Sequence, residues 1–510
     1  MNLVKDPWIP VVLPNGSSAP ASLRSLYERG EEIRDLAVNP PQRIALMRLL
    51  ICITQAALDG PEDEEEWVDG KPRIIPESLA YLDKWQDRFE LYGKHPFLQL
   101  AGLEVDEGKD KPADFIDLRL ATGNNPTLFD QGSNGRGRRF CDAEKALALL
   151  TFMNFSTGGK VGQSIWKGQK HSDATFAAPA IKYAHTFVCG SEIVDTLYRN
   201  LLTKGSGPAA IEDLPNVQWG KPIWEAQPTA DSDSAAFDNA CCTYLGRLVP
   251  FSRLVLLDYR GDTCRCIVGP LPKGRRIDHL PAYREPWATI RQNRKGEDYY
   301  LPLRSEKHMW RELGGILAVS ATTHGNCRCA MPLARFANMA GDAGVDVWVG
   351  GLEVGDQAAK VSDTLEWVFH IPAGLLHSIQ MSRYESGVQK ASEAEAALGA
   401  ACKKYVTATG QAAALGAKAR AQFWGMLDTQ HGRLIDAGND MDAILDRVWY
   451  PIVRDAMEAA YAFACPHTTP RQIEAFAQGT KALKLNKFGD MPRSEAVCVH
   501  GEDQGEEKGG

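Results

Sequence analysis

The spacing of apolar residues predicts a strand and two helices near the N-terminus. Residues 8–13 have an extended pattern that ends in an Asn-Gly turn signal, and Ser22 can cap a short helix that follows. Pro40 opens a longer helix that Gly60 closes. Residues 77–92 predict a further amphipathic helix. The apolar positions of the long helix keep helical spacing: Ile44, Met47, Leu50, Ile51 and Leu58.

The pattern changes twice toward the C-terminus. Between Leu245 and Leu303 the apolar residues form short runs separated by Gly and Pro, which is typical of β-structure. After Pro372 the sequence is Ala-rich with a helical period, and this indicates a helical bundle. The predicted helical segments are residues 374–399, 400–427, 441–464 and 471–485. The Gly- and Glu-rich residues 501–510 are expected to form a disordered tail.

Two long polar loops flank one helix between Asp117 and Lys170. Residues 124–139 and 156–170 are rich in Gly, Asn, Ser and Arg, and Asp142 can cap the helix between them. Loops of this length are uncommon in compact domains, and they usually bind a ligand or remain disordered. This segment is therefore the first candidate for a functional region.

Composition limits the class of protein. Of the 510 residues, 44% are hydrophobic and 24% are charged, which is typical of a globular protein and argues against a disordered or collagenous one. No apolar run approaches the roughly 20 residues that cross a bilayer. Asp6 and Pro7 interrupt any signal peptide, so we expect a cytoplasmic protein. The 12 cysteines fit reduced thiols in that compartment.

Charge is distributed unevenly along the chain. The formal net charge of -8 argues against a protein that coats nucleic acid without selectivity. Residues 258–312, however, hold 12 Arg or Lys residues against 8 Asp or Glu residues, a local excess of four positive charges. Such a run is usually a solvated face, and it forms a phosphate-binding surface only if the charges cluster in space.

Searches for catalytic motifs return only fragments. Gly158-Gly159-Lys160 lacks the first Gly of a P-loop and is followed by Val161 in place of the metal-binding Ser or Thr. The sequence contains no H-E-x-x-H, H-x-H or G-x-S-x-G pattern. We therefore expect neither an enzyme nor a cofactor.

The cysteines offer one weak candidate for a metal site. Cys264 and Cys266 would lie on one face of a strand, and together with Cys141 and Glu144 they could form a site of three thiolates and one carboxylate. Structural zinc is seldom bound by that set, so separate reduced thiols are the favoured interpretation. A metal- or thiol-dependent hydrolase of unknown substrate stays open as the alternative function.

A series of short motifs covers nearly the whole chain. They are Asn2-Leu3 with Trp8-Ile9-Pro10-Val11, Asn125 to Gln131, the Gly-rich residues 156–162, Ser305-Glu306-Lys307 with Trp310 to Leu313, Gly350-Gly351 with Asp356-Gln357-Ala358, and the terminal helical segments. Together and in this order they resemble the CasA family. That family is the large subunit of the type I-E CRISPR surveillance complex, Cascade.

The resemblance implies an α+β fold, with a large mixed α/β N-terminal domain over residues 1–371 and a four-helix bundle over residues 372–500. It implies a non-catalytic protein that contacts the 5′ handle of the guide RNA and recognises the protospacer-adjacent motif in double-stranded target DNA. Such a protein promotes R-loop formation, because base pairing reads the target while protein reads a short duplex motif. The implied partners are the other Cascade subunits and a helicase-nuclease recruited after target binding, with no membrane.

The resemblance also assigns contacts with the RNA handle. Phe129 can stack on a base, and the arginines of its loop can pair with phosphates. An alternative role for Phe129 is to anchor the loop in the core. The assigned residues are Leu128, Phe129, Asp130, Gln131, Arg136, Arg138 and Arg139.

Recognition of the DNA motif is assigned in the same way to Gly158, Gly159, Lys160, Gly162, Lys273, Asp356, Gln357 and Ala358. Glycines suit a minor-groove reader because backbone without Cβ can approach base edges, although a plain turn would have the same sequence. Gln357 matches a wedge that splits the first base pairs. Asp356 stands where the family carries an Asn, and a carboxylate accepts hydrogen bonds but cannot donate them. Arg275 and Arg276 are alternatives to Lys273.

Overall fold

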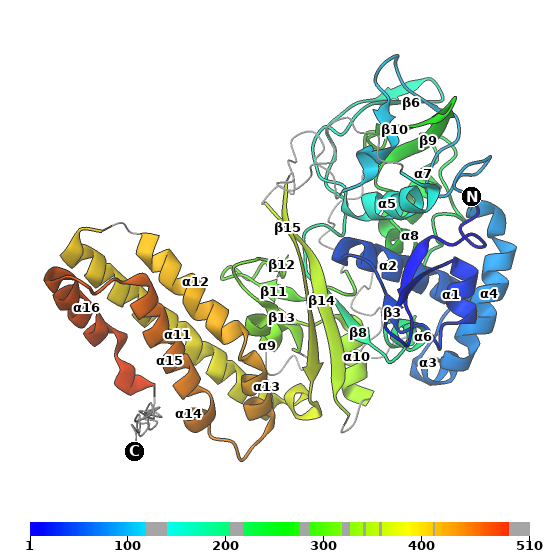
Figure 1. Cartoon of the computed structure of the whole chain (residues 1–510). Helices are drawn as coiled ribbons and strands as arrows, with labels where there is room; N and C mark the ends of the chain where they lie inside the picture. Colours follow the sequence, from blue (N-terminus) through cyan, green and yellow to red (C-terminus); the bar gives the residue numbers. More distant parts are fainter. Residues whose placement is uncertain are drawn as a thin grey trace, which may run out of the picture. The chain divides into compact units, whose positions relative to one another are not determined.

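The computed structural model describes residues 1–118, 140–204, 218–275, 285–318, 327–339, 343–355, 360–411 and 414–488. The chain divides into two compact units, an N-terminal unit over Met1–Leu376 and a C-terminal unit over His377–Gly510 (Figure 1). The N-terminal unit mixes helices with small sheets, whereas every described element of the C-terminal unit is helical. The mixed α+β class predicted from the sequence is thus confirmed.

The first elements of the N-terminal unit follow the sequence pattern closely. Strand β1 (Ile9–Val12) pairs antiparallel with β2 (Ser18–Ala21) and β3 (Asp35–Leu36). Ser22 caps α1 (Leu23–Glu28), and the Asn39 side chain accepts a hydrogen bond at the start of α2 (Pro40–Leu58). Helix α2 is buried on nearly all sides, so it forms the centre of the core.

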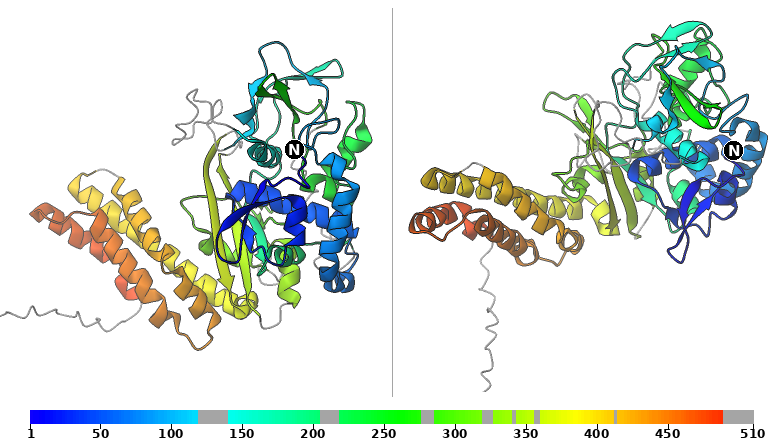
Figure 2. Two further views of the ribbon diagram at one scale, coloured as in Figure 1. Left: turned by 45° about the vertical axis from the view of Figure 1, so that its right-hand side comes forward. Right: turned by 45° about the horizontal axis from the view of Figure 1, so that its top comes forward.

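The rest of the N-terminal unit consists of short antiparallel sheets and helices, several of which pack against α2. Two of the described sheets have the strand orders β4 (Leu103–Glu104)-β6 (Ser164–Trp166)-β7 (Gln169–His171) and β5 (Lys111–Pro112)-β10 (Thr263–Gly269)-β9 (Leu254–Arg260). Two more have the orders β12 (Asp298–Tyr300)-β11 (Ile290–Gln292)-β13 (Cys327–Arg328) and β15 (Val361–Ile371)-β14 (Val345–Val354)-β8 (His185–Cys189). The helices are α3 (Glu64–Gly70), α4 (Ile74–Lys84), α5 (Asp142–Phe155), α6 (Ile193–Arg199), α7 (Ser234–Cys242), α8 (Tyr244–Leu248), α9 (Leu313–Ile316) and α10 (Met331–Met339), with short 3₁₀ turns between elements. The long yellow-green hairpin in Figure 2 is β14 with β15.

Two helix predictions in this unit need correction. The helix expected over residues 77–92 is α4, which ends at Lys84 because Phe89 leaves the helical path and stacks on Phe97 in the core, with ring centroids 5.2 Å apart. Asp142 is the first residue of α5 and does not cap it; Cys141 holds the cap position. The Asp142 carboxylate instead bonds neighbouring side chains.

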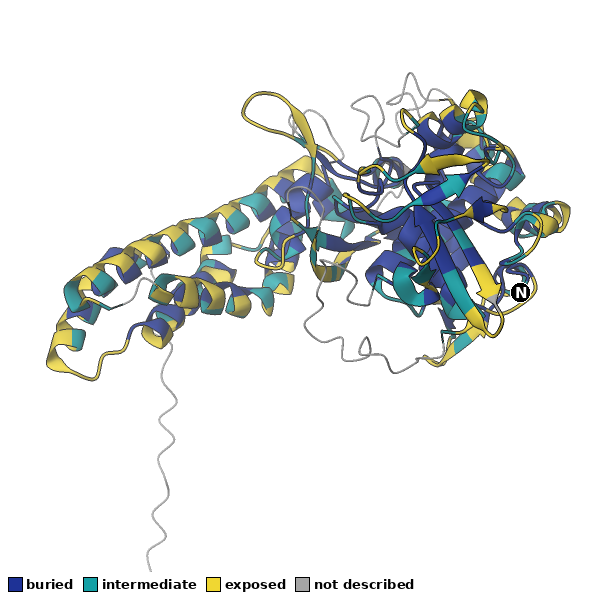
Figure 3. Cartoon of the chain, turned by 90° about the horizontal axis from the view of Figure 1, so that it is seen from above, coloured by how far each residue is buried: buried dark blue, intermediate teal, exposed yellow. Residues whose placement is uncertain are grey.

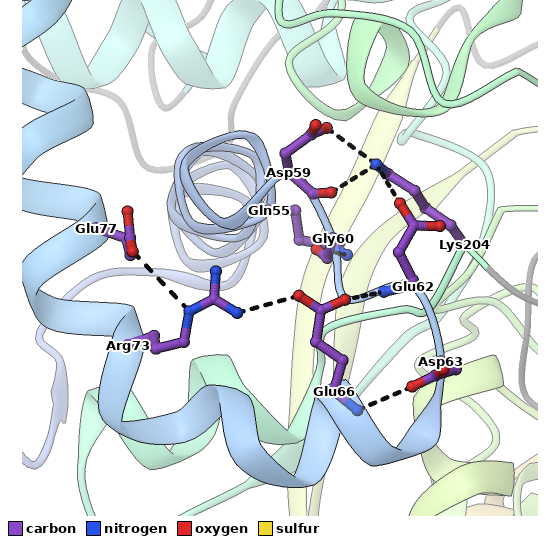
Figure 4. Close-up of polar contacts among 9 residues, drawn as sticks. All are labelled: Gln55, Asp59, Gly60, Glu62, Asp63, Glu66, Arg73, Glu77 and Lys204. Atoms are coloured by element: carbon purple, nitrogen blue, oxygen red, sulfur yellow. Dashed lines mark hydrogen bonds and ion pairs between the residues drawn. The ribbon is translucent and has the colours of Figure 1, made fainter.

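The acidic segment Glu62 to Glu66, which follows α2, forms ion pairs with Lys204 and Arg73 (Figure 4). The Lys204 ammonium contacts the Asp59 carboxylate at 2.9 Å and the Glu62 carboxylate at 2.9 Å. Glu66 accepts a hydrogen bond from the Glu62 backbone at 2.7 Å and pairs with Arg73 at 3.1 Å. Partial burial lowers the pKa of Lys204, but its carboxylate partners outweigh that effect and raise it. These contacts therefore fix the backbone of the acidic segment where α3 begins.

A buried ion cluster joins three distant segments of the N-terminal unit. Arg48 on α2 pairs with Glu285 at 2.9 Å, and Arg247 on α8 pairs with the other Glu285 oxygen at 3.2 Å. Both guanidinium groups also donate to backbone carbonyl oxygens, including that of Leu248 at 2.9 Å from Arg48 Nε. Burial would raise the pKa of Glu285, but the two arginines lower it to about 2, so the carboxylate stays ionised.

The C-terminal unit consists of α11 (Ser378–Thr409), α12 (Ala414–Asp428), α13 (His431–Asn439), α14 (Leu445–Val448), α15 (Tyr450–Ala464) and α16 (Pro470–Leu483), followed by a 3₁₀ turn. Helix α11 packs against α12, α13, α15 and α16. The helices of this unit carry stripes of buried and exposed residues in Figure 3. This arrangement is that of amphipathic helices around their own core.

Two boundaries predicted in the C-terminal region are wrong. Helix α11 runs without a break through Gly399 and Ala400, where two helices were expected, and ends at Gly410 with a φ of 73°. Its buried stripe continues across the glycine from Ala394 and Leu398 to Ala401, so packing outweighs the low helix propensity of Gly. The residues between the helices expected at 400–427 and 441–464 contain a further helix, α13.

Candidate nucleic-acid interface

The glycine loop, residues 156–163, follows the C-terminal end of α5, and the buried side chain of Arg253 anchors it. This buried guanidinium donates to the carbonyl oxygens of Thr157 and Phe176, both at 2.9 Å. Burial lowers the pKa of Arg253 to about 9. Gly159 and Thr175 exchange two backbone hydrogen bonds of 2.9 and 3.0 Å. The loop therefore has a defined backbone path between its two ends.

Two glycines in this region are required by contact or conformation. Gly159 has a φ of 104°, a region that side-chain-bearing residues rarely adopt. A Cβ on Gly162 would overlap the carbonyl oxygen of Val268, near the end of β10. The loop is thus pressed against β10 with no room for a side chain at position 162.

The loop presents backbone and one cation to solvent. Gly159 and Lys160 are exposed, whereas Gly158 and Gly162 are half-buried. Lys160 has no hydrogen bond or ion pair with any part of the chain that the structure describes. An exposed glycine next to a free ammonium group is a surface that a nucleic-acid backbone can approach closely.

Lys273 is connected to the glycine loop through β10, the strand against which Gly162 packs. The turn that carries it follows directly on β10, after Gly269, whose missing Cβ leaves space for the Ser164 hydroxyl at the start of β6. Lys273 is exposed, and it lines a pocket together with Lys170 of β7. Arg275, an alternative candidate, lies 3.7 Å from Asp238. Arg276, the other alternative, lies outside the described residues.

Asp106 links the end of the glycine loop to this pocket. Its carboxylate accepts a hydrogen bond from Gln163 Nε2 at 2.7 Å and pairs with Lys170. The hydrogen bonds from Lys170 and Gln163 lower the pKa of Asp106. Sequence reasoning missed both Asp106 and Arg253, since neither lies in a recognisable motif. Only the fold brings them to the loop.

The remaining predicted DNA and RNA contacts fall outside the described residues. These are the DNA residues Asp356, Gln357 and Ala358 and the RNA-handle residues Leu128, Phe129, Asp130, Gln131, Arg136, Arg138 and Arg139. The structure does describe the strands on either side of the first group. Gly355 N donates to Lys360 O at 3.2 Å, next to the paired ends of β14 and β15.

A polar network occupies the first turn of α5, just after residue 139. Asp142 accepts hydrogen bonds from Tyr92 at 2.8 Å, Lys145 at 2.9 Å and Tyr259 at 3.2 Å. Burial and these carboxylate and phenol contacts raise the pKa of Tyr92. Partial burial raises the pKa of Asp142, but the bonds from Lys145 and Tyr92 lower it overall. Lys145 is thus engaged within the fold.

The candidate thiols differ in their surroundings. Cys141 is exposed, Cys264 is half-buried and Cys266 is buried, where burial raises the pKa of its thiol. A raised pKa disfavours the thiolate that binds metals or attacks substrates. Within the described ranges, no three His, Cys, Asp or Glu side chains are grouped so that they could hold a metal ion. The same ranges contain no helix with the length and apolarity to cross a bilayer.

The fold and this surface define a mixed α+β protein with a separate helical unit and an exposed glycine loop. The model of the family described as CRISPR-associated protein Cse1 matches residues 2–461. The chain therefore belongs to the Cse1 family, and the resemblance to CasA drawn from the sequence motifs is confirmed. The CRISPR-associated protein CasA/Cse1 of Thermus thermophilus is 29% identical over 407 residues, which cover 77% of this chain and 75% of that relative.

Solved structures share the fold. The crystal structure of Thermus thermophilus CasA has a TM-score of 0.76 at 23% identity and covers 96% of this chain and 99% of its own. Thermobifida fusca Cse1 has a TM-score of 0.74 at 22% identity, with 95% and 98% covered. A chain of a CRISPR RNA-guided surveillance complex has a TM-score of 0.74 at 18% identity, with 95% and 99% covered.

Proposed function

We propose that this protein is the large, non-catalytic subunit of a type I-E CRISPR surveillance complex, Cascade, and that it recognises the protospacer-adjacent motif of double-stranded target DNA. One observation carries the proposal: a Cse1-family chain holds an anchored glycine loop that exposes Gly159 and Lys160 and whose Gly162 packs against β10, the strand that leads to Lys273. Its net charge of -8 is compatible with this role, because other subunits and the guide RNA share the binding energy.

The glycine loop would read the minor groove of the motif. Backbone without side chains can approach base edges there, and the acceptor pattern of that groove permits several related motifs. Lys273, and Asp356 with Ala358 beside Gln357, would complete the contacts. Gln357 would act as a wedge that separates the first base pairs and starts the R-loop, since the guide then pairs with the target strand.

The RNA handle would be held by the loop that contains Leu128 to Arg139. Phe129 would stack on a base, and Arg136, Arg138 and Arg139 would pair with phosphates. The C-terminal unit would act as a four-helix bundle that contacts other Cascade subunits. The packing of α11 against α12, α15 and α16 supports a bundle. Recruitment of a helicase-nuclease would follow target binding.

The decisive experiment uses a guide-RNA-loaded Cascade that lacks its large subunit. Target-DNA binding is measured with and without this protein over a randomised motif beside a fixed target. We expect addition of the protein to restore tight binding for a subset of motifs, which also identifies the motif. If the protein neither joins the complex nor changes its binding, the proposal is wrong.

The wedge has its own test. Gln357→Ala should reduce duplex opening, followed by permanganate reactivity of unpaired thymines, while assembly with the guide RNA stays at the wild-type level. Lys5→Ala, at an exposed residue remote in sequence from all proposed contacts, is the control. Unchanged opening in Gln357→Ala would remove this residue from the wedge role.

A further inference from the structure

A polar pocket of about 390 Å³ lies next to the end of β10 in the N-terminal unit. Its walls come from β7, from the turn after β10 and from Asp231. The cationic and imidazole side chains that line it are Lys170, His171 and Lys273. No role is assigned to Lys170, His171 or Asp231 by the proposed function.

The pocket is connected to the glycine loop through the chain segment that follows the loop. The β6–β7 hairpin follows the loop directly, and its register pairs Ser164 with His171 and Ile165 with Lys170. Ser164 packs into the space left by Gly269, at the end of the strand that leads to Lys273. The β6–β7 hairpin and β10 therefore connect the glycine loop to the walls of this pocket.

The donors of the pocket are held in different ways. His171 Nε2 lies 3.3 Å from Asp231 Oδ2, with side chains 9% and 21% exposed, but this buried nitrogen makes no hydrogen bond with the described residues. Lys170 is held by Asp106. Lys273 is exposed and has no hydrogen bond or ion pair with the described residues, which leaves its ammonium group available to a ligand.

We propose that this pocket binds one backbone phosphate of the target DNA next to the recognised motif. Lys273 supplies the free charge, His171 donates to a phosphate oxygen, and Lys170 borders the site. A phosphate fits because its oxygens only accept hydrogen bonds and phosphate contacts set the register of a protein on DNA. Asp173 and Asp231 also line the pocket, and their carboxylates oppose an anion there. This inference rests on the proposed function.

The test measures binding of duplex targets by the guide-loaded complex, with single backbone phosphates near the motif replaced by uncharged methylphosphonates. Lys273→Ala should weaken binding of the natural duplex roughly 10-fold and reduce the salt-dependence slope by about 0.9. One methylphosphonate position should weaken the wild type and have no further effect in Lys273→Ala. His171→Ala should show the same position-specific coupling, and His171→Gln, which retains a donor, should restore part of the affinity.

Controls separate the two proposals. Lys5→Ala removes the same charge from an exposed residue that does not line the pocket, and should leave affinity and slope unchanged. Asp173→Asn should tighten binding. If motif-dependent binding is present but no methylphosphonate position couples to Lys273 or His171, the phosphate pocket is wrong while the proposed function stands. If motif-dependent binding is absent in the wild type, both are wrong.

Discussion

Two groups of cationic residues in the N-terminal unit have opposite surroundings. Arg48 and Arg247 are buried and bonded to Glu285 and to backbone oxygens, whereas Lys160 and Lys273 are exposed and without partners among the described residues. The guanidinium groups of the first pair form their ion pairs and hydrogen bonds inside the protein and stabilise the fold. The second group keeps its capacity for a ligand. Charge in the sequence therefore indicates function only after burial and pairing are known.

The largest effect is expected from removing the centre of the buried cluster. Glu285→Ala leaves two buried guanidinium groups without their carboxylate and should lower the free energy of unfolding by about 3–5 kcal/mol. Chemical denaturation followed by tryptophan fluorescence measures it. Glu107→Ala, at an exposed carboxylate, is the matched control and should change stability by less than about 0.5 kcal/mol. A loss below about 1 kcal/mol for Glu285→Ala would contradict the structural role of the cluster.

Acid should destabilise the same buried region of the N-terminal unit. Burial and the charge of Arg48 lower the pKa of His185 to about 3 from an ordinary value of 6.5. In this pH range His185 binds a proton in the unfolded chain but not in the folded chain. The free energy of unfolding therefore decreases as the pH falls from 6.5 toward 3. The loss between pH 6.5 and 5 is on the order of 2 kcal/mol. Glu285 adds a further loss as the pH falls from 4.5 toward 2.

Urea denaturation at pH 7, 6 and 5 checks this dependence. His185→Gln should flatten the slope of stability against pH, because the titrating imidazole is gone. His370→Gln, at an imidazole that is 77% exposed, should keep the wild-type slope. An equal slope in all three proteins would show that His185 is not the titrating group.

A smaller effect is expected where the glycine loop meets β10. Gly162→Ala places a Cβ against the Val268 carbonyl and should cost about 1–2 kcal/mol, with weaker DNA binding as the loop shifts. Gly399→Ala adds a methyl group in open space on α11 and should instead stabilise the protein by about 0.5–1 kcal/mol. Thermal unfolding and target binding of both variants measure the contrast. Equal behaviour of the two would argue against the close contact at Gly162.

The smallest effect on stability is expected at the exposed cations. Lys160→Ala should change the free energy of unfolding by less than about 0.5 kcal/mol, since the side chain has no partner to lose among the described residues. Within the guide-loaded complex it should still reduce the salt-dependence slope of DNA binding by about 0.9. A variant that unfolds easily, or that binds DNA with the wild-type slope, would place Lys160 in the structural group instead.

Local sequence signals predicted the elements that carry their own boundaries. Ser22 caps α1 and Pro40 begins α2 as expected, because caps and prolines act within one helical turn. The break expected after Gly399 was wrong, because the buried stripe of α11 continues past it. The helix expected over 77–92 ends earlier, at Lys84, for a similar reason: Phe89 packs against Phe97 in the core. Packing outweighed propensity in both places.

The sequence by itself determined the family, the mixed fold class and the position of the glycine loop, because motifs and hydrophobic periods are properties of neighbouring residues. Only the tertiary structure decided which charges are free. It buried Arg253 beneath the loop, paired Arg48 with a residue 237 positions away, and brought His171 to Asp231 beside Lys273. Such contacts join segments that are distant in the chain, and their strength depends on burial and geometry that no local pattern encodes.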